Sequence, residues 1–272
     1  MSIVSTVDAL RTLASQLPTY PPRAVVDRRL VERRRPGEVP VTWIDPAASR
    51  IGTVVHLHGG FYLNGETPRH WAWLEELRRR AGTAAAMIHY RMPPRFPFPA
   101  ACEDTLAALR GMLQTLDLQP GRWVLSGDSA GAGLALAVTR MLIDADQHAP
   151  AMLLLTSPWI DLADAHVDSA EAVRAARLYA RDVPVTDPRV SPLLGDVHGL
   201  PPVHLTAGGQ DVMVGQGRRL AEKILAAGGQ IQVLDEPAAG HDFVMHGGPL
   251  AQAALRAQIA AVRGALSVRP AL

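Results

Sequence analysis

The feature that most constrains the fold is an alternation of short apolar runs with longer amphipathic ones. Six short runs have the length and residue types of buried strands: Thr53–Leu57, Thr83–Ile88, Trp123–Leu125, Met152–Leu155, Val203–Thr206 and Ile231–Leu234. Between and after them lie runs with helical spacing: Pro68–Arg80, Ala100–Leu116, Ser129–Ile143, Gly217–Ala227 and Pro249–Leu266. Strands that alternate with helices predict an α/β fold, in which helices flank both faces of a mostly parallel sheet.

The first part of the chain does not follow this alternation. Ala24–Val31 and Val39–Ile44 have the composition of extended strands and predict an antiparallel pair at one edge of the sheet. Residues 1–18 mix apolar and polar side chains at helical spacing, which predicts an N-terminal helix. Prolines within residues 18–22 separate that helix from the strands.

A second departure lies between Trp159 and Leu194, where the sequence has no strand signal and one short helical pattern, Ala170–Arg181. An insertion here would lie over the carboxyl ends of the strands, where open α/β sheets bind ligands. We therefore expect a single domain over residues 1–272, with a small cap formed by residues 1–22 and 160–190.

Composition excludes several classes of function. The chain has 272 residues, 48% of them hydrophobic, which is enough for one large core. Its 27 Lys and Arg residues oppose 26 Asp and Glu residues and are mostly scattered, so no basic strip is available for nucleic acid. No apolar run approaches the roughly 18 residues of a membrane span, and no signal peptide is apparent, so we expect a cytoplasmic protein. The single cysteine, Cys102, has no partner for an internal disulfide.

The strongest local motif is Gly127-Asp128-Ser129-Ala130-Gly131. It follows one predicted strand and opens the next predicted helix, which is the context of a nucleophile elbow. In such an elbow the serine occupies a tight turn, and its neighbours two positions away must be small. The amino end of the helix then presents unpaired amides where negative charge develops. An ordinary glycine-rich strand-to-helix turn is the alternative interpretation.

A serine hydroxyl needs a base, and in this chain order an acid and then a histidine should follow. Asp211 and His241 each end a loop just after a predicted strand. Together with Ser129 they would lie at the carboxyl edge of the sheet. His246 is the rival histidine, and the rival acids are Asp235, Glu236 and Asp242.

A second site element is His58-Gly59-Gly60-Phe61, at the end of the strand Thr53–Leu57. The glycine pair lets the backbone turn so that its amides face the serine, and with the amide of Ala130 they would form an oxyanion hole. A simple strand-ending turn is the alternative. His56 and His58 share one face of the strand, but no third ligand has a suitable spacing, so we expect no metal site.

Taken together, these motifs resemble the hormone-sensitive-lipase-like esterases, a branch of the α/β hydrolases. The resemblance covers roughly Val54 to His246. It includes the intact elbow and an oxyanion motif that has Phe61 where the family has a third glycine. Further similar segments are Tyr90-Arg91, Pro97-Phe98-Pro99-Ala100-Ala101, Asp104, Ser157-Pro158-Trp159, Asp161-Leu162, Asp187-Pro188-Arg189-Val190-Ser191-Pro192-Leu193 and His241-Asp242-Phe243.

The resemblance implies an α/β-hydrolase fold and a serine carboxylesterase that works through an acyl-enzyme intermediate without a cofactor. Ser129 would be the nucleophile, His241 the general base and then acid, and Asp211 the residue that orients the imidazole. In this family the second and third residues of the glycine motif donate amides, so Gly60 and Phe61 would be the main donors. The stretch from Trp159 to Asp187 is shorter than in typical members, which favours short-chain esters.

Two other functions stay open on the sequence. The same triad would serve an arylformamidase or a lactonase, and some arylformamidases of this fold also lack the third glycine. A non-catalytic small-molecule receptor is the other alternative, although such receptors usually lose the catalytic histidine. Phe61, Tyr62 and Trp159 are the expected substrate-binding walls. Related enzymes often form homodimers, and the sequence leaves the oligomeric state open.

Overall fold

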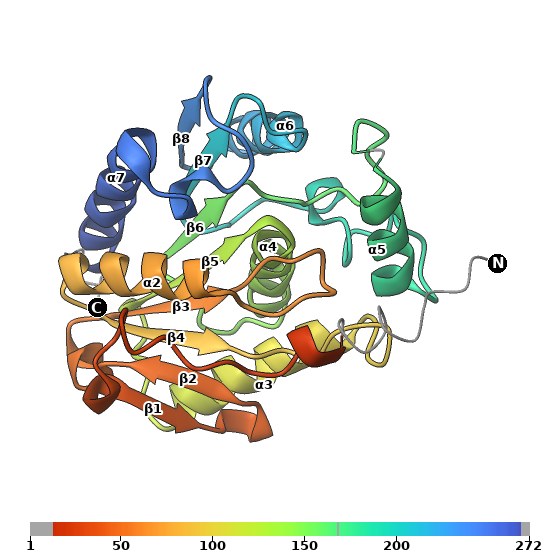
Figure 1. Ribbon diagram of the computed structural model, residues 1–272. Helices are drawn as coiled ribbons and strands as arrows, with labels where there is room; N and C mark the ends of the chain where they lie inside the picture. The colour runs from red at the N-terminus through yellow and green to blue at the C-terminus, as the bar shows by residue number, and fades with distance from the viewer. Residues whose placement is uncertain (1–12, 168, 268–272) are drawn as a thin grey trace.

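The sheet lies at the centre of the molecule (Figure 1). The structure, a computed structural model, describes residues 13–167 and 169–267. Within these residues one sheet has eight strands in the order β1-β2-β4-β3-β5-β6-β7-β8. The strands are β1 Val31–Arg34, β2 Val41–Ile44, β3 Thr53–Leu57, β4 Ala84–Ile88, β5 Trp123–Asp128, β6 Met152–Thr156, β7 Val203–Gly208 and β8 Ile231–Glu236. The six strands from β3 onward run parallel, and β2 pairs antiparallel with both β1 and β4.

The predicted antiparallel edge is confirmed, but the position of its first strand was wrong. Residues 24–30 of the predicted run Ala24–Val31 do not form a strand, because the backbone N–H groups of Val25 and Val26 bond to the carbonyl of Pro22 in a turn. Asp27 then caps a short 3₁₀ helix by accepting a hydrogen bond from the Arg29 amide. Extended pairing therefore begins only at Val31.

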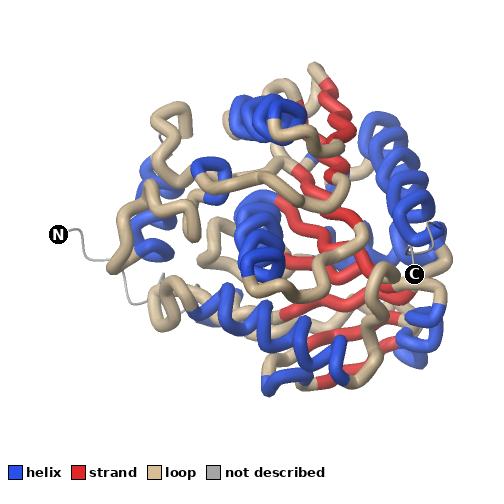
Figure 2. The backbone as a smooth tube through the Cα atoms, turned by 180° about the vertical axis from the view of Figure 1, so that it is seen from behind, coloured by secondary structure: helices blue, strands red, loops and turns tan. Residues whose placement is uncertain are grey.

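Helices cover both faces of the sheet, as expected (Figures 1 and 2). They are α2 Pro68–Ala81, α3 Ala100–Gln114, α4 Ser129–Asp144, α5 Ala170–Ala180, α6 Val214–Ala226 and α7 Gly248–Ser267. Successive strand residues face opposite layers: Val54 belongs to the core on the side of α2 and α7, whereas Val55 belongs to the core on the side of α3, α4 and α6. Parallel strands buried on both sides explain why the sequence shows continuous apolar runs there.

Local signals explain where α2 begins and ends. Thr67 and His70 form a reciprocal capping box, and Pro68 occupies the first helical turn, where its missing N–H costs nothing. The helix ends at Gly82, whose φ of +79° is the left-handed conformation that glycine adopts readily. His70, in the first turn of α2, lies 3.2 Å from Asp128, so the amino end of α2 lies at the same edge of the sheet as the end of β5.

The stretch between β6 and β7 carries α5 on the side of the sheet where the strands end (Figure 1). As predicted, its described residues from Trp159 to Leu194 contain no strand. The Tyr179 ring of α5 stacks on the Tyr62 ring with centroids 3.7 Å apart. The predicted N-terminal helix, residues 1–18, falls mostly outside the described residues. None of the described helices is long and apolar enough to span a membrane.

Candidate active site

The elbow at the end of β5 has the expected conformation. Ser129 opens α4 with a φ of +48°, a strained left-handed conformation for a non-glycine residue, and is 3% exposed. A Cβ atom on Gly127 would overlap the carbonyl oxygen of Gly131, and one on Gly131 would overlap that of Leu57. Both motif glycines are therefore required by the close approach of the helix to β3 and β5.

The loops after β7 and β8 bring Asp211 and His241 together. His241 Nδ1 lies 2.8 Å from Asp211 Oδ2, and the other carboxylate oxygen of Asp211 accepts a hydrogen bond from the Met213 amide at 2.9 Å. The Gln210 amide donates to the Ala239 carbonyl at 2.9 Å, which ties the two loops to each other. Asp211 is buried, so its carboxylate is held in one orientation against the imidazole.

The rival residues are placed differently. Asp235 forms an ion pair with Arg218, and His246 is exposed. Asp242, however, reaches His241 from the other side: its Oδ2 lies 3.3 Å from His241 Nε2. Among the described residues the Ser129 hydroxyl has no hydrogen-bond partner, so in this structure Nε2 faces Asp242 rather than the serine.

The contact with Asp242 could not be read from the sequence. It depends on the left-handed backbone of Asp242, with φ of +49°, which turns the side chain back over the preceding imidazole. The Asp242 amide donates to Ser157 Oγ at 2.9 Å, and this bond holds the turn. No sequence signal beyond the adjacency of the two residues pointed to this arrangement.

The two carboxylates change the acidity of the histidine. Burial disfavours a charged imidazole, but the hydrogen bond from Asp211 and the charges of Asp242 and Asp211 outweigh it and raise the pKa of His241 to about 9. Burial, and then the nearby charge of Asp128, raise the pKa of Asp242 above its usual range. The imidazole therefore favours its protonated form at neutral pH.

The turn at residues 58–66, named the glycine turn below, lies directly against the elbow. Gly59 donates its amide to Asp128 Oδ2 at 3.0 Å, so this amide is not available to a substrate. That corrects the prediction that Gly59 contributes a donor to the oxyanion hole. The amides of Gly60 and Phe61 have no partner among the described residues, and Gly60 has a φ of +107°, which glycine readily adopts. Phe61 adopts a left-handed φ of +57°.

Asp128 links the elbow to the glycine turn and to α2. Besides the Gly59 amide, its carboxylate meets His56 Nε2 at 3.1 Å and His70 Nε2 at 3.2 Å. Burial opposes the charge, but His70 and His56 hold the pKa of Asp128 well below its usual range, and Asp128 in turn raises the pKa of His70. Sequence reasoning missed His70, whose only local signal is the capping box with Thr67.

The predicted wall residues lie beside the serine. The Trp159 amide donates to the Ser129 carbonyl at 3.0 Å, and the Phe61 ring meets the Trp159 ring edge to face, with centroids 5.4 Å apart. Tyr62 and Trp159 are each 1% exposed, so they form the buried back of this wall, whereas Phe61 is half-buried at its front. His56 and His58 are both buried with separate partners, Ser126 and Asp128 for the first and Gly59 for the second.

Comparisons with known proteins match this arrangement. A family model described as the alpha/beta hydrolase fold matches residues 54–245. An acetyl-hydrolase of Streptomyces hygroscopicus is 37% identical, over 75% of this chain and 72% of the relative. A carboxylesterase of Mycobacterium tuberculosis is 26% identical, over 88% of this chain and 82% of the relative. The crystal structure of EstE5 soaked with p-nitrophenyl butyrate superposes with a TM-score of 0.85 at 25% identity, over 98% of this chain and 94% of that one.

The range that the family model matches contains the glycine turn, the elbow and both loops that carry Asp211 and His241. It spans well over half of the chain. The family resemblance predicted from the motifs is thereby confirmed: the chain belongs to the α/β-hydrolase-fold family.

Proposed function

We propose that the protein is a serine carboxylesterase that cleaves short-chain carboxylic esters. The observation that carries the proposal is the 2.8 Å contact between His241 Nδ1 and Asp211 Oδ2, at the same edge of the sheet as the strained Ser129. A buried carboxylate on Nδ1 fixes the imidazole so that Nε2 is the nitrogen that exchanges protons. The relatives named as esterase, carboxylesterase and acetyl-hydrolase support this reaction class.

The geometry supports a two-step reaction. Neutral His241 takes the proton of Ser129 as its oxygen attacks the ester carbonyl, and the amides of Gly60, Phe61 and Ala130 stabilise the resulting oxyanion. His241 then returns the proton to the departing alcohol, which leaves an acyl-enzyme. Water, deprotonated by the same imidazole, attacks the acyl group, and the imidazolium returns the proton to the Ser129 oxygen as the carboxylic acid leaves. Each step requires Nε2 of His241 to exchange its proton with the reacting oxygen, and the contact with Asp242 competes with that exchange.

The short-chain preference rests on the wall beside Ser129. Phe61 and Trp159 meet edge to face there, and Tyr62 behind them is stacked on Tyr179 of α5. Such packed rings leave little room for a long acyl chain without rearrangement. The acetyl-hydrolase relative supports a small acyl group. The cap of residues 1–22 and 160–190, the homodimer and the cytoplasmic location stay predictions.

The decisive experiment measures hydrolysis of p-nitrophenyl esters from acetate to dodecanoate by the wild type and by Ser129→Ala. We expect turnover of the short esters, and a loss of about 10⁴-fold or more in kcat in the variant. Absence of turnover in the wild type, or activity retained by Ser129→Ala, would refute the esterase proposal. Formyl anilides and lactones in the same panel separate an amidase or a lactonase, and a fluorophosphonate probe that leaves Ser129 unlabelled would favour the receptor.

A matched pair of histidine variants tests the choice of base. His241→Ala should lose activity to an extent comparable with Ser129→Ala, because the members of a triad act as a unit. His246→Ala, five residues away and exposed, should keep kcat near the wild-type value. The reverse pattern would exchange the roles of the two histidines.

A further inference from the structure

The glycine turn is held from outside by a segment near the N-terminus. Ser15 accepts a hydrogen bond from the Gly65 amide at 3.0 Å, and its hydroxyl meets Asn64 Oδ1 at 3.1 Å. Gln16 Nε2 donates to the carbonyls of Leu63 and Pro93, at 2.8 Å and 2.6 Å. A Cβ atom on Gly65 would overlap the Ser15 carbonyl oxygen, so this glycine is what allows the segment to lie so close. Residues 15–19 are named the N-terminal strap below.

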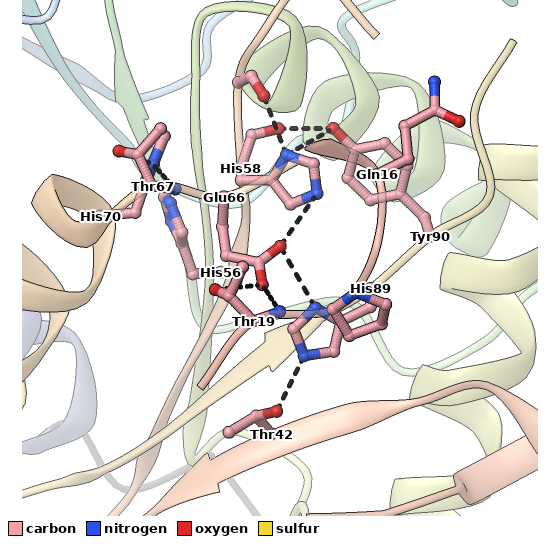
Figure 3. Close-up of polar contacts among 12 residues, drawn as sticks. Gln16, Thr19, Thr42, His56, His58, Glu66, Thr67, His70, His89 and Tyr90 are labelled. Carbon is pink, nitrogen blue, oxygen red and sulfur yellow. Dashed lines mark hydrogen bonds and ion pairs between the residues drawn. The ribbon is translucent and has the colours of Figure 1, made fainter. Parts of the chain in front are cut away.

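Glu66 is the last residue of the glycine turn, and its carboxylate binds Thr19 of the strap (Figure 3). Its carboxylate is buried, and its Oε1 accepts hydrogen bonds from both the amide and the hydroxyl of Thr19, at 2.6 Å and 2.8 Å. Its Oε2 lies 3.3 Å from His89 Nδ1, and Thr42 holds the other nitrogen of that ring at 2.8 Å. Burial opposes the charge of Glu66, but His89 outweighs it and holds the pKa of this carboxyl below its usual range. A buried carboxylate needs such partners, so Glu66 and the strap depend on each other.

On the other side of Glu66 lies His58, the first residue of the glycine turn. His58 Nε2 lies 3.9 Å from Glu66 Oε2, and Figure 3 shows the imidazole between this carboxylate and Tyr90. His58 Nδ1 donates to the Gly59 carbonyl at 2.8 Å, while the Tyr90 hydroxyl donates to the His58 carbonyl. Because a peptide unit is planar and trans, the Gly59 carbonyl and the Gly60 N–H point in opposite directions. The side chain that holds this carbonyl therefore aims the Gly60 amide.

We propose that Glu66 is a positioning residue, which together with Gln16 and Thr19 of the N-terminal strap aims the oxyanion-hole amides of Gly60 and Phe61. This inference rests on the proposed esterase function. Neither Glu66 nor the strap touches the substrate, and their effect passes through the backbone of the glycine turn, which the strap holds at Leu63, Gly65 and Glu66. Release of the strap lowers the rate of the chemical step and leaves substrate binding largely unchanged.

The test compares Gln16→Leu and Glu66→Gln with the wild type. Gln119→Leu, at an exposed glutamine in the loop between α3 and β5, is the control for the first change. For p-nitrophenyl acetate, kcat is measured per serine titrated with a fluorophosphonate, which removes any effect of misfolded protein. We expect kcat to fall about 10-fold in both variants with KM within about two-fold, since one oxyanion donor alone contributes about 10²–10³ in kcat. The affinity for phenylboronic acid, which forms a tetrahedral adduct with the serine, should fall by a similar factor.

Conservative rescue gives a second measurement. Thr19→Val removes the hydroxyl that donates a hydrogen bond to Glu66, and Thr19→Ser keeps that hydroxyl. We therefore expect Thr19→Val to lower kcat and Thr19→Ser to keep most of the wild-type kcat. Amide hydrogen exchange in peptides covering residues 58–66 should become faster in Thr19→Val and Gln16→Leu, but not in Gln119→Leu.

The outcomes separate the two proposals. If the wild type hydrolyses the ester and both Gln16→Leu and Glu66→Gln keep wild-type kcat per titrated serine, the positioning role is wrong, even where the melting temperature falls. If Glu66→Gln fails to fold, Gln16→Leu and the Thr19 pair decide the matter alone. If the wild type has no turnover and no titratable serine, the esterase proposal itself is wrong. The proposed role of the strap, which rests on it, is then wrong as well.

Discussion

His241 lies between two carboxylates, one on each ring nitrogen. Asp211 holds Nδ1 at 2.8 Å and Asp242 lies 3.3 Å from Nε2. The first contact orients the base, whereas the second competes with the serine for the nitrogen that must take a proton. Both negative charges stabilise the imidazolium, and the pKa of His241 is raised to about 9 in consequence. The base is therefore mostly protonated at neutral pH and gains activity as the pH rises.

Replacement of Asp242 by asparagine should move the acidic limb of the pH profile. Only neutral His241 accepts the proton of Ser129, so kcat/KM of the wild type should rise with pH up to about the pKa of His241. Asp242→Asn removes the carboxylate beside Nε2, whose charged form favours the imidazolium, so the pKa of His241 should fall and activity at pH 7 should increase. The pH dependence of kcat/KM for p-nitrophenyl acetate measures this shift. A limb that stays in place would show that Asp242 does not act on the catalytic imidazole.

At the scale of elements, the glycine turn and α5 form one wall beside the nucleophile. Phe61 and Tyr62 both have left-handed backbones, and this conformation sends the Phe61 ring onto Trp159 and the Tyr62 ring onto Tyr179. The backbone amide of Phe61 is present whatever the side chain. The ring therefore changes the shape of the acyl site and leaves the number of amide donors in the oxyanion hole unchanged.

Phe61→Gly should widen the range of acyl chains. Loss of the ring removes the front of the wall, and glycine accepts the left-handed backbone at lower cost. We expect the ratio of kcat/KM for p-nitrophenyl hexanoate to that for the acetate to rise about 10-fold, because one or two methylene groups in an apolar pocket are worth about that much. Steady-state kinetics on the two esters give the ratio. An unchanged ratio would place the acyl chain elsewhere.

Elements with a strong local pattern were predictable from the sequence. The strand Thr53–Leu57 has the predicted bounds, and β5 extends its predicted run to Asp128 because the elbow continues the pairing with β6. The edge strand was misplaced because the turn at Pro22 takes up backbone donors that an extended strand would leave free. The order of serine, acid and histidine, with each residue just after a predicted strand, also predicted the Asp211–His241 pair.

What the sequence could not supply is the set of contacts between distant segments. The bond from Gly59 to Asp128 joins residues 69 positions apart, and it changes Gly59 from an expected donor to the substrate into part of the scaffold. Glu66 and His89 likewise meet only in the folded chain. Such pairs carry no local periodicity or capping signal, so no pattern within a short window indicates them.

At the scale of the whole molecule, a buried glutamine ties one helical layer to the sheet. Gln258 of α7 is fully buried; its Nε2 lies 3.1 Å from the Thr156 hydroxyl of β6 and 3.2 Å from the Thr206 hydroxyl of β7. Its Oε1 accepts a hydrogen bond from Trp73 Nε1 of α2 at 2.9 Å. One amide group thus satisfies polar atoms from three other elements.

Gln258→Leu should destabilise the fold without a direct effect on chemistry. The change leaves a buried indole N–H and two buried hydroxyls short of partners, and we expect the free energy of unfolding to fall by about 2–4 kcal/mol. Gln252→Leu, on the exposed side of the same helix, is the matched control and should change it little. Urea unfolding followed by tryptophan fluorescence measures both. Equal stability of the two variants would mean that the buried amide contributes no net stability.

The order of strands also determines when the enzyme can first work. Ser129 follows β5 and Asp211 follows β7, and β6 separates these two strands in the sheet. His241 follows β8, so the acid–base pair and the nucleophile meet only after β6 has been inserted between the halves that carry them. A refolding chain in which β6 has not yet paired with β5 and β7 contains all three catalytic side chains, but they are not yet together. The return of hydrolysis after dilution from denaturant therefore reports when the sheet is complete. It should begin no earlier than the last of β5, β6, β7 and β8 joins the sheet.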